Sequence, residues 1–187
     1  MAAPLAPARR LFTVDEFVRM AQAGVFRPDD RLELVEGEIL QMTPIGSAHA
    51  ACVARLTHIF SRLADRAVLF VQNPVRLSER SLPQPDLALL RPREDFYAAA
   101  HPGPSDVLLL VEVADTTLAY DRDVKVPLYA RAGIPEVWVV DLEGRVVWVY
   151  REPGAGGYGW VRRFGPGERL DLAAFPDFGV AAEEVLG

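Results

Sequence analysis

Apolar and polar residues recur along the chain with two different periods, which predict a mixture of helices and strands. Helical spacing predicts three helices, at about 14–23, 48–65 and 121–132. Apolar-rich runs predict strands at 68–77, 86–90, 107–113 and 137–141. The runs at 86–90 and 107–113 are nearly continuous, which is typical of strands covered on both faces of a sheet. The charged and proline-containing segment 91–106 is expected to be a surface excursion.

Local signals mark the N-terminal part of the chain. Thr13 and Glu16 have the spacing of a capping box, so a helix should begin between them. Two short strand-like runs within residues 31–40 flank Glu36-Gly37, a sequence that favours a tight β-hairpin. We therefore expect an N-terminal helix followed by a hairpin.

The C-terminal part is predicted to be rich in strands. Two strand-like runs, at 145–151 and 158–164, flank a glycine-rich tip. A short strand follows at 168–172, and a helical turn is expected at 181–186. The tip matches the G-x-G-x-x-G pattern, but a strand rather than a helix follows it, so we expect no nucleotide cofactor there.

These elements define the expected fold class. Strand 107–113, helix 121–132 and strand 137–141 form a βαβ unit of ordinary size. The fold class is α/β (mixed), with a central mixed sheet flanked by helices. We expect a single domain over residues 1–187, with residues 1–10 as a flexible tail.

Composition narrows the function classes. The formal net charge of −6 argues against strong non-specific binding of nucleic acid, although a local basic cleft remains compatible with it. One cysteine and three scattered histidines argue against a disulfide and against a zinc cluster. No signal peptide or membrane span is predicted, so we expect a cytoplasmic protein without membrane partners.

The basic residues are unusual. Lys and Arg together number 20, and Lys125 is the only lysine. A lysine ammonium is compact and its pKa responds to its surroundings, whereas arginine stays charged. Lys125 could be a random survivor of an arginine-rich composition, or it could sit where arginine would fail.

Two acidic residues lie in strands that otherwise look buried. Asp86 begins one apolar run and Glu112 lies near the end of another. Two buried carboxylates repel each other unless a cation lies between them, and Mg²⁺ prefers such oxygen ligands. In the structural alternative, Asp86 caps a strand, Glu112 pairs with an arginine, and Lys125 is an exposed partner of Asp121. Tyr129 lies one helical turn after Lys125.

In this order and spacing the residues resemble the PD-(D/E)XK nucleases, which have the restriction-endonuclease-like fold, and most closely their Uma-two branch of endonucleases. The resemblance covers residues 12–150. It rests on Pro85-Asp86, on the early run from Glu33 to Glu38, on His49, on the runs Glu112–Thr117 and Asp121–Tyr129, and on the run Ala132–Asp141.

The resemblance implies an enzyme that hydrolyses phosphodiester bonds of DNA and depends on Mg²⁺ or Mn²⁺. It implies that Asp86, Glu112 and the carbonyl group of Val113 bind the metal, and that Lys125 is the catalytic lysine. The usual lysine lies two residues after the glutamate, where this chain has Ala114. Further candidate site residues are Glu33, Glu38, His49 and Tyr129.

Partners follow from the same resemblance. DNA would be held through phosphate contacts by arginines, for which the candidates are Arg55, Arg62, Arg91 and Arg93. A homodimer is expected because double-strand cleavage needs two sites. Two alternatives stay open: a non-catalytic dimeric binding or regulatory protein that keeps the fold, and a small hydrolase of another phosphate substrate, which would need an enclosed pocket.

Overall fold

A six-stranded mixed sheet forms the centre of the computed structural model, which describes residues 8–187. Its strands follow the order β3-β4-β5-β6-β7-β8 and pair antiparallel except for the parallel pair of β5 and β6. Their bounds are β3 Val68–Val71, β4 Leu87–Leu90, β5 Val107–Ala114, β6 Glu136–Asp141, β7 Val146–Gly154 and β8 Gly157–Phe164. The predicted central mixed sheet is confirmed. Of the flexible tail predicted for residues 1–10, residues 1–7 lie outside the residues that the structure describes.

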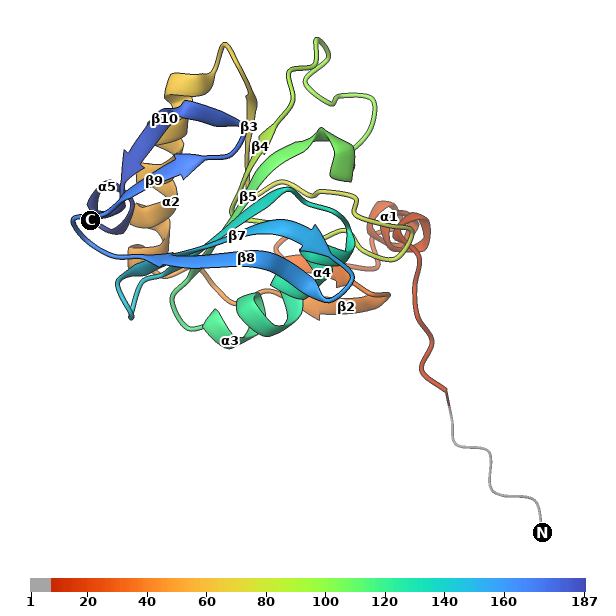
Figure 1. Ribbon diagram of the computed structural model, residues 1–187. Helices are drawn as coiled ribbons and strands as arrows, with labels where there is room; N and C mark the ends of the chain where they lie inside the picture. Colours follow the sequence, from red (N-terminus) through yellow and green to blue (C-terminus); the bar gives the residue numbers. More distant parts are fainter. Residues whose placement is uncertain (1–7) are drawn as a thin grey trace.

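Helices cover both faces of this sheet (Figure 1). One face packs against α2 (Ser47–Phe60), α5 (Ala182–Leu186) and the hairpin of β9 (Arg169–Leu172) and β10 (Phe175–Ala181). The other face packs against α4 (Val126–Arg131). Successive residues of a strand point to opposite faces. The continuous apolar sequence of β5 therefore contributes side chains to two separate hydrophobic cores.

The crossover from β5 to β6 differs from the prediction in its first half. The helical segment begins at Leu118, not at 121, and consists of α3 (Leu118–Tyr120), a π-helix η3 (Asp121–Lys125) and α4. Pro127 has no N–H group and its ring disfavours a regular helical turn before it. The preceding turn is wider, and the N–H of Val126 donates to the carbonyl of Asp121 in the π pattern.

Two other predicted elements are shorter than expected. The strand predicted over 68–77 ends at Val71, because Gln72 has a positive φ of 51° and Pro74 cannot donate to a neighbouring strand. The helix predicted over 48–65 ends at Phe60 and continues as a 3₁₀-helix η1 (Ser61–Leu63). Segment 91–106 contains only the 3₁₀-helix η2 (Pro104–Asp106).

The N-terminal elements form as the sequence predicts. Thr13 and Glu16 cap α1 (Val14–Gln22) reciprocally. The hairpin of β1 (Leu32–Val35) and β2 (Glu38–Gln41) turns at Glu36 and Gly37, which both have positive φ. The C-terminal hairpin tip also forms, since Gly154 pairs with Gly157 across the turn. None of the described helices is long and apolar enough to cross a membrane.

A buried carboxylate attaches the C-terminal hairpin to the central sheet. Glu136 of β6 is fully buried. Its Oε1 accepts hydrogen bonds from the indole N–H of Trp138 at 2.8 Å and from Arg151 at 2.9 Å, and its Oε2 accepts one from the backbone N–H of Ala173 at 2.7 Å. Ala173 lies in the turn between β9 and β10, so one side chain joins the two sheets.

Replacing Glu136 with alanine should lower the free energy of unfolding by about 3 kcal/mol, because the buried indole N–H of Trp138 and two part-buried donors lose their acceptor. Urea denaturation followed by circular dichroism measures this loss. The control is Glu143→Ala, which removes an exposed glutamate and should leave stability close to wild type. Equal effects of the two substitutions would contradict the anchoring role of Glu136.

Candidate metal-dependent active site

A cavity of about 520 Å³ lies where the N-terminal hairpin, the loop before α2 and the β5–α4 crossover meet. Acidic groups line it from several elements: Glu33 of β1, Asp86 before β4, Glu112 of β5, Asp115 after β5 and Asp121 of η3. The basic side chains that line it are Arg31, Lys125 and His49, of which His49 pairs with Asp86. The cavity therefore concentrates negative charge.

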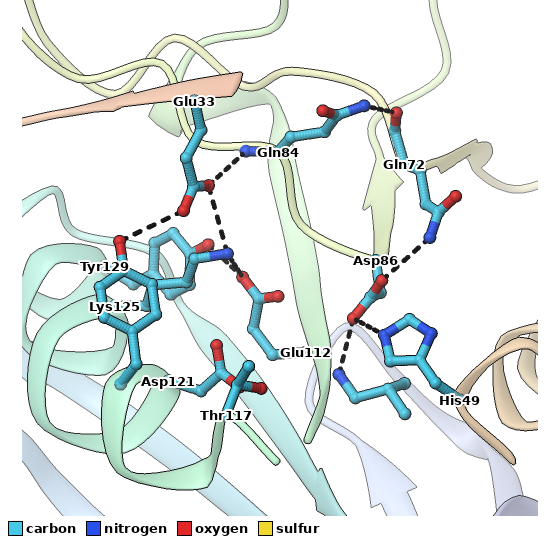
Figure 2. A network of polar contacts seen from close by, with 12 residues as sticks. Glu33, His49, Gln72, Gln84, Asp86, Glu112, Thr117, Asp121, Lys125 and Tyr129 are labelled. Carbon is cyan, nitrogen blue, oxygen red and sulfur yellow. Dashed lines mark hydrogen bonds and ion pairs between the residues drawn. The ribbon is translucent and has the colours of Figure 1, made fainter. Parts of the chain in front are cut away.

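Lys125 lies between two carboxylates at the base of this cavity (Figure 2). Its ammonium is 3.3 Å from Oε2 of Glu33 and 3.2 Å from Oε1 of Glu112, and the three side chains are 5%, 3% and 3% exposed. The alternative in which Lys125 is an exposed partner of Asp121 is wrong. Asp121 is itself buried and accepts a hydrogen bond from the hydroxyl of Thr117 at 2.6 Å.

Two tyrosines complete the contacts of these carboxylates. Tyr120 donates to Oε1 of Glu33 at 3.2 Å, and the buried hydroxyl of Tyr129 donates to Oε1 of Glu112. The backbone N–H of Gln84 also donates to Oε2 of Glu33, at 3.2 Å. The other oxygen of Glu112, Oε2, points toward the side of the site that carries Asp86 (Figure 2).

Burial and neighbouring charges shift the pKa values of Glu112 and Lys125. Burial raises the pKa of Glu112 to about 8, with further contributions from the charges of Asp121 and Asp86, while Lys125 opposes the shift. Burial alone would lower the pKa of Lys125. The carboxylates of Glu112 and Glu33 outweigh burial and hold that pKa well above its ordinary value. Lys125 therefore stays protonated at neutral pH, and the site favours an added cation.

Asp86 has its own set of donors. It accepts hydrogen bonds from the backbone N–H of Val113 at 2.9 Å, from Nε2 of His49 at 3.0 Å and from the amide of Gln72 at 3.2 Å. Burial would raise the pKa of Asp86, but the hydrogen bond and charge of His49 bring it below its usual value. Asp86 is thus held ionised, beside Glu112.

The donor set fits a hard divalent cation that keeps much of its water. In a strand the N–H and C=O of one residue point to the same side, so the carbonyl of Val113 faces the gap toward Asp86, as its N–H does. Oε2 of Glu112, Asp86 and this carbonyl are oxygen ligands of the kind that Mg²⁺ prefers. Within residues 8–187, no group of three or more His, Cys, Asp or Glu side chains is placed to hold a metal ion.

The structure brings most of the predicted site residues together. Six of them are connected by the hydrogen bonds and ion pairs described above: Glu33, His49, Asp86, Glu112, Lys125 and Tyr129. Glu38 does not: its exposed side chain pairs with Arg9 at 2.6 Å. The register puts both glutamates on one face of the hairpin, but Glu38 lies beside the turn, opposite Val35, beyond the Glu33–Leu40 pair that lines the cavity.

The four candidate DNA-binding arginines do not line the cavity. Arg55 donates to the carbonyls of Val185 and Leu186 at the C-terminal helix. The other three also have partners within the chain: Arg62 lies 4.7 Å from the ring centre of Phe178, Arg91 donates to Ser105, and Arg93 pairs with Asp95.

Sequence reasoning did not single out three groups that hold the site. Gln72 and Tyr120 contact Asp86 and Glu33, and Gln84 contacts Glu33 through its backbone. The only local signal is at Gln84, which directly precedes the Pro85-Asp86 pair. Gln72 lies in an irregular segment with no periodic pattern, so nothing in its surroundings marks it.

Comparisons with known proteins agree with this fold. The family model of Uma2, described as "Putative restriction endonuclease", matches residues 14–183. The chain belongs to the Uma2 family. A similar solved structure is that of a putative nuclease belonging to DUF820 from Anabaena variabilis, with a TM-score of 0.72 and 16% identity, covering 94% of this chain and 97% of that one. At this identity the likeness shows the fold. No curated protein matches the chain.

Replacing Lys125 with methionine should lower the free energy of unfolding by about 3 kcal/mol or more, because it leaves Glu33 and Glu112 buried without their cation. Urea denaturation at neutral pH measures the loss. Arg122→Met is the matched control, since Arg122 is an exposed partner of Asp123 and its removal should change stability little. If both variants were as stable as wild type, the buried ion pairs would not exist in solution.

Proposed function

We propose that the protein is a Mg²⁺- or Mn²⁺-dependent endonuclease that hydrolyses phosphodiester bonds of DNA. One observation carries the proposal: a protonated Lys125 contacts Glu112 at the base of a cavity that also holds the ionised Asp86. Membership of a restriction endonuclease family supports it. The homodimer and the cytoplasmic location stay predictions.

The proposed role of each site residue follows from the atoms that it has available for a metal ion or a phosphate. Asp86, Oε2 of Glu112 and the carbonyl of Val113 would hold the metal. A bound Mg²⁺ polarises a phosphate oxygen and makes a neighbouring water more acidic. Lys125 would act as a donor of hydrogen bonds, because the carboxylates of Glu112 and Glu33 raise its pKa and favour its protonated form. Its ammonium would stabilise the negative charge that develops on the phosphate.

Glu33 and the tyrosines would position Lys125. Glu33 and Glu112 hold the ammonium from two sides, which limits its motion. Tyr120 and Tyr129 hold the carboxylates in turn. An arginine at position 125 would keep the charge, but its planar guanidinium is larger and does not fit a space shaped for an ammonium.

Purified wild-type protein should cleave DNA with Mg²⁺ or Mn²⁺ and lose this activity with EDTA. Glu112→Gln and Asp86→Asn should each lower the cleavage rate by about 100-fold or more, because each removes a carboxylate that would hold the metal. Lys125→Arg should lower it as much, because the larger guanidinium does not fit the place of the ammonium. Asp123→Asn is the control on the same helical segment; it is exposed and should cleave at the wild-type rate. Circular dichroism checks that each variant is folded.

Metal binding can be measured without catalysis. In calorimetric titration with Mn²⁺, Glu112→Gln should weaken binding by about tenfold or more. Glu38→Gln, which removes an exposed carboxylate outside the cavity, should bind Mn²⁺ like wild type. Equal Mn²⁺ affinity in Glu112→Gln and wild type would contradict the proposed ligand set. Metal binding without cleavage of any DNA would favour the non-catalytic alternative.

A further inference from the structure

The depth of the site limits what can reach it. Glu33, Glu112 and Lys125 have side chains that are no more than 5% exposed, and Asp86 is 10% exposed. They lie in a cavity of about 520 Å³, a size typical of sites that surround a small molecule. A phosphodiester must enter this cavity to meet Lys125, because the ammonium does not protrude to the surface.

The charge of the walls limits how many phosphates can enter. Five acidic side chains line the cavity with three basic ones, and two of the basic ones are already paired: Lys125 with Glu33 and Glu112, and His49 with Asp86. A DNA duplex carries one negative charge for about every 1.7 Å of its axis, and proteins that bind it neutralise phosphates with Lys and Arg side chains. The candidate arginines are not part of this lining. The cavity therefore suits one or two phosphates with a cation, not a duplex backbone.

The wall formed by β2 and the loop before α2 carries four apolar side chains beside the polar ones of Gln41 and Thr43. Leu40, Met42, Pro44 and Ile45 line it, and Ile45 is 40% exposed although it is a large apolar residue. Apolar side chains pack favourably on the face of an unpaired base. In a duplex these faces are stacked on their neighbours and are not available.

From depth, charge and wall chemistry we infer that the cavity takes a phosphodiester in an unpaired stretch of DNA, with a neighbouring base packed against Ile45 and Met42. This inference rests on the proposed endonuclease function and specifies its substrate. Three labelled substrates of one sequence separate the possibilities: a single strand, its perfect duplex, and a duplex with an internal unpaired stretch. The full-length protein is assayed on each with Mn²⁺.

The single strand and the unpaired stretch should be cleaved about tenfold faster than the perfect duplex, and cleavage in the third substrate should lie within the unpaired stretch. Cleavage of the perfect duplex at an equal or higher rate would overturn the inference while leaving the nuclease function intact. Binding is measured separately by fluorescence anisotropy in Ca²⁺. Preferential binding of the single strand without any cleavage would support the inference and overturn the nuclease function. Equal binding of both forms, or no binding, would overturn the inference.

Ile45→Ser tests the apolar wall directly. It should weaken single-strand binding about fivefold, because a base loses part of its apolar contact. Since Ile45 is partly exposed, the variant should fold. The matched control is Val25→Ser, which replaces an exposed apolar residue that does not line the cavity and should bind like wild type. If Ile45→Ser bound the single strand as tightly as wild type, the proposed packing of a base against Ile45 would be wrong.

Discussion

Burial of the Lys125 ammonium between two carboxylates forces three distant parts of the chain to meet. Glu33 comes from the N-terminal hairpin, Glu112 from the centre of the sheet, and Lys125 from the crossover helix. A buried charge without a partner costs several kcal/mol, so each of the three side chains is stabilised in its buried position by the others. The hairpin is thereby held at the open side of the sheet, where it forms a wall of the cavity.

The π-helix determines which side chains of the crossover face the site. It spans Asp121–Lys125 and ends two residues before Pro127. A π turn places side chains at angles that a regular α-helix would not, and such turns often occur at functional sites. Here Asp121 and Lys125 are both buried and both line the cavity. The proline that distorts the helix therefore contributes to the site although it contacts no substrate.

Two buried ionic networks have opposite characters. Around Glu136 the donors match the acceptor closely, and the network attaches the C-terminal hairpin to the sheet. Around Glu112, burial raises the pKa of the carboxyl group, the charges of Asp121 and Asp86 raise it further, and Lys125 opposes the shift. An excess of buried carboxylates is unfavourable until a cation binds. The first network stabilises the scaffold, whereas the second is suited to bind a cation and a phosphate.

Local sequence patterns determined much of the fold and the core of the site. The capping box at Thr13, the hairpin turn at Glu36-Gly37 and the apolar run of β5 depend on neighbouring residues, and all three form as predicted. The motif residues Asp86, Glu112 and Lys125 were identified by their order and spacing. Only the tertiary structure decided which other groups join them. Tyr120 meets Glu33 across 87 residues of chain, and Arg55 reaches the C-terminal carbonyls across 130. Such contacts depend on how separate elements pack, and no local pattern encodes that packing.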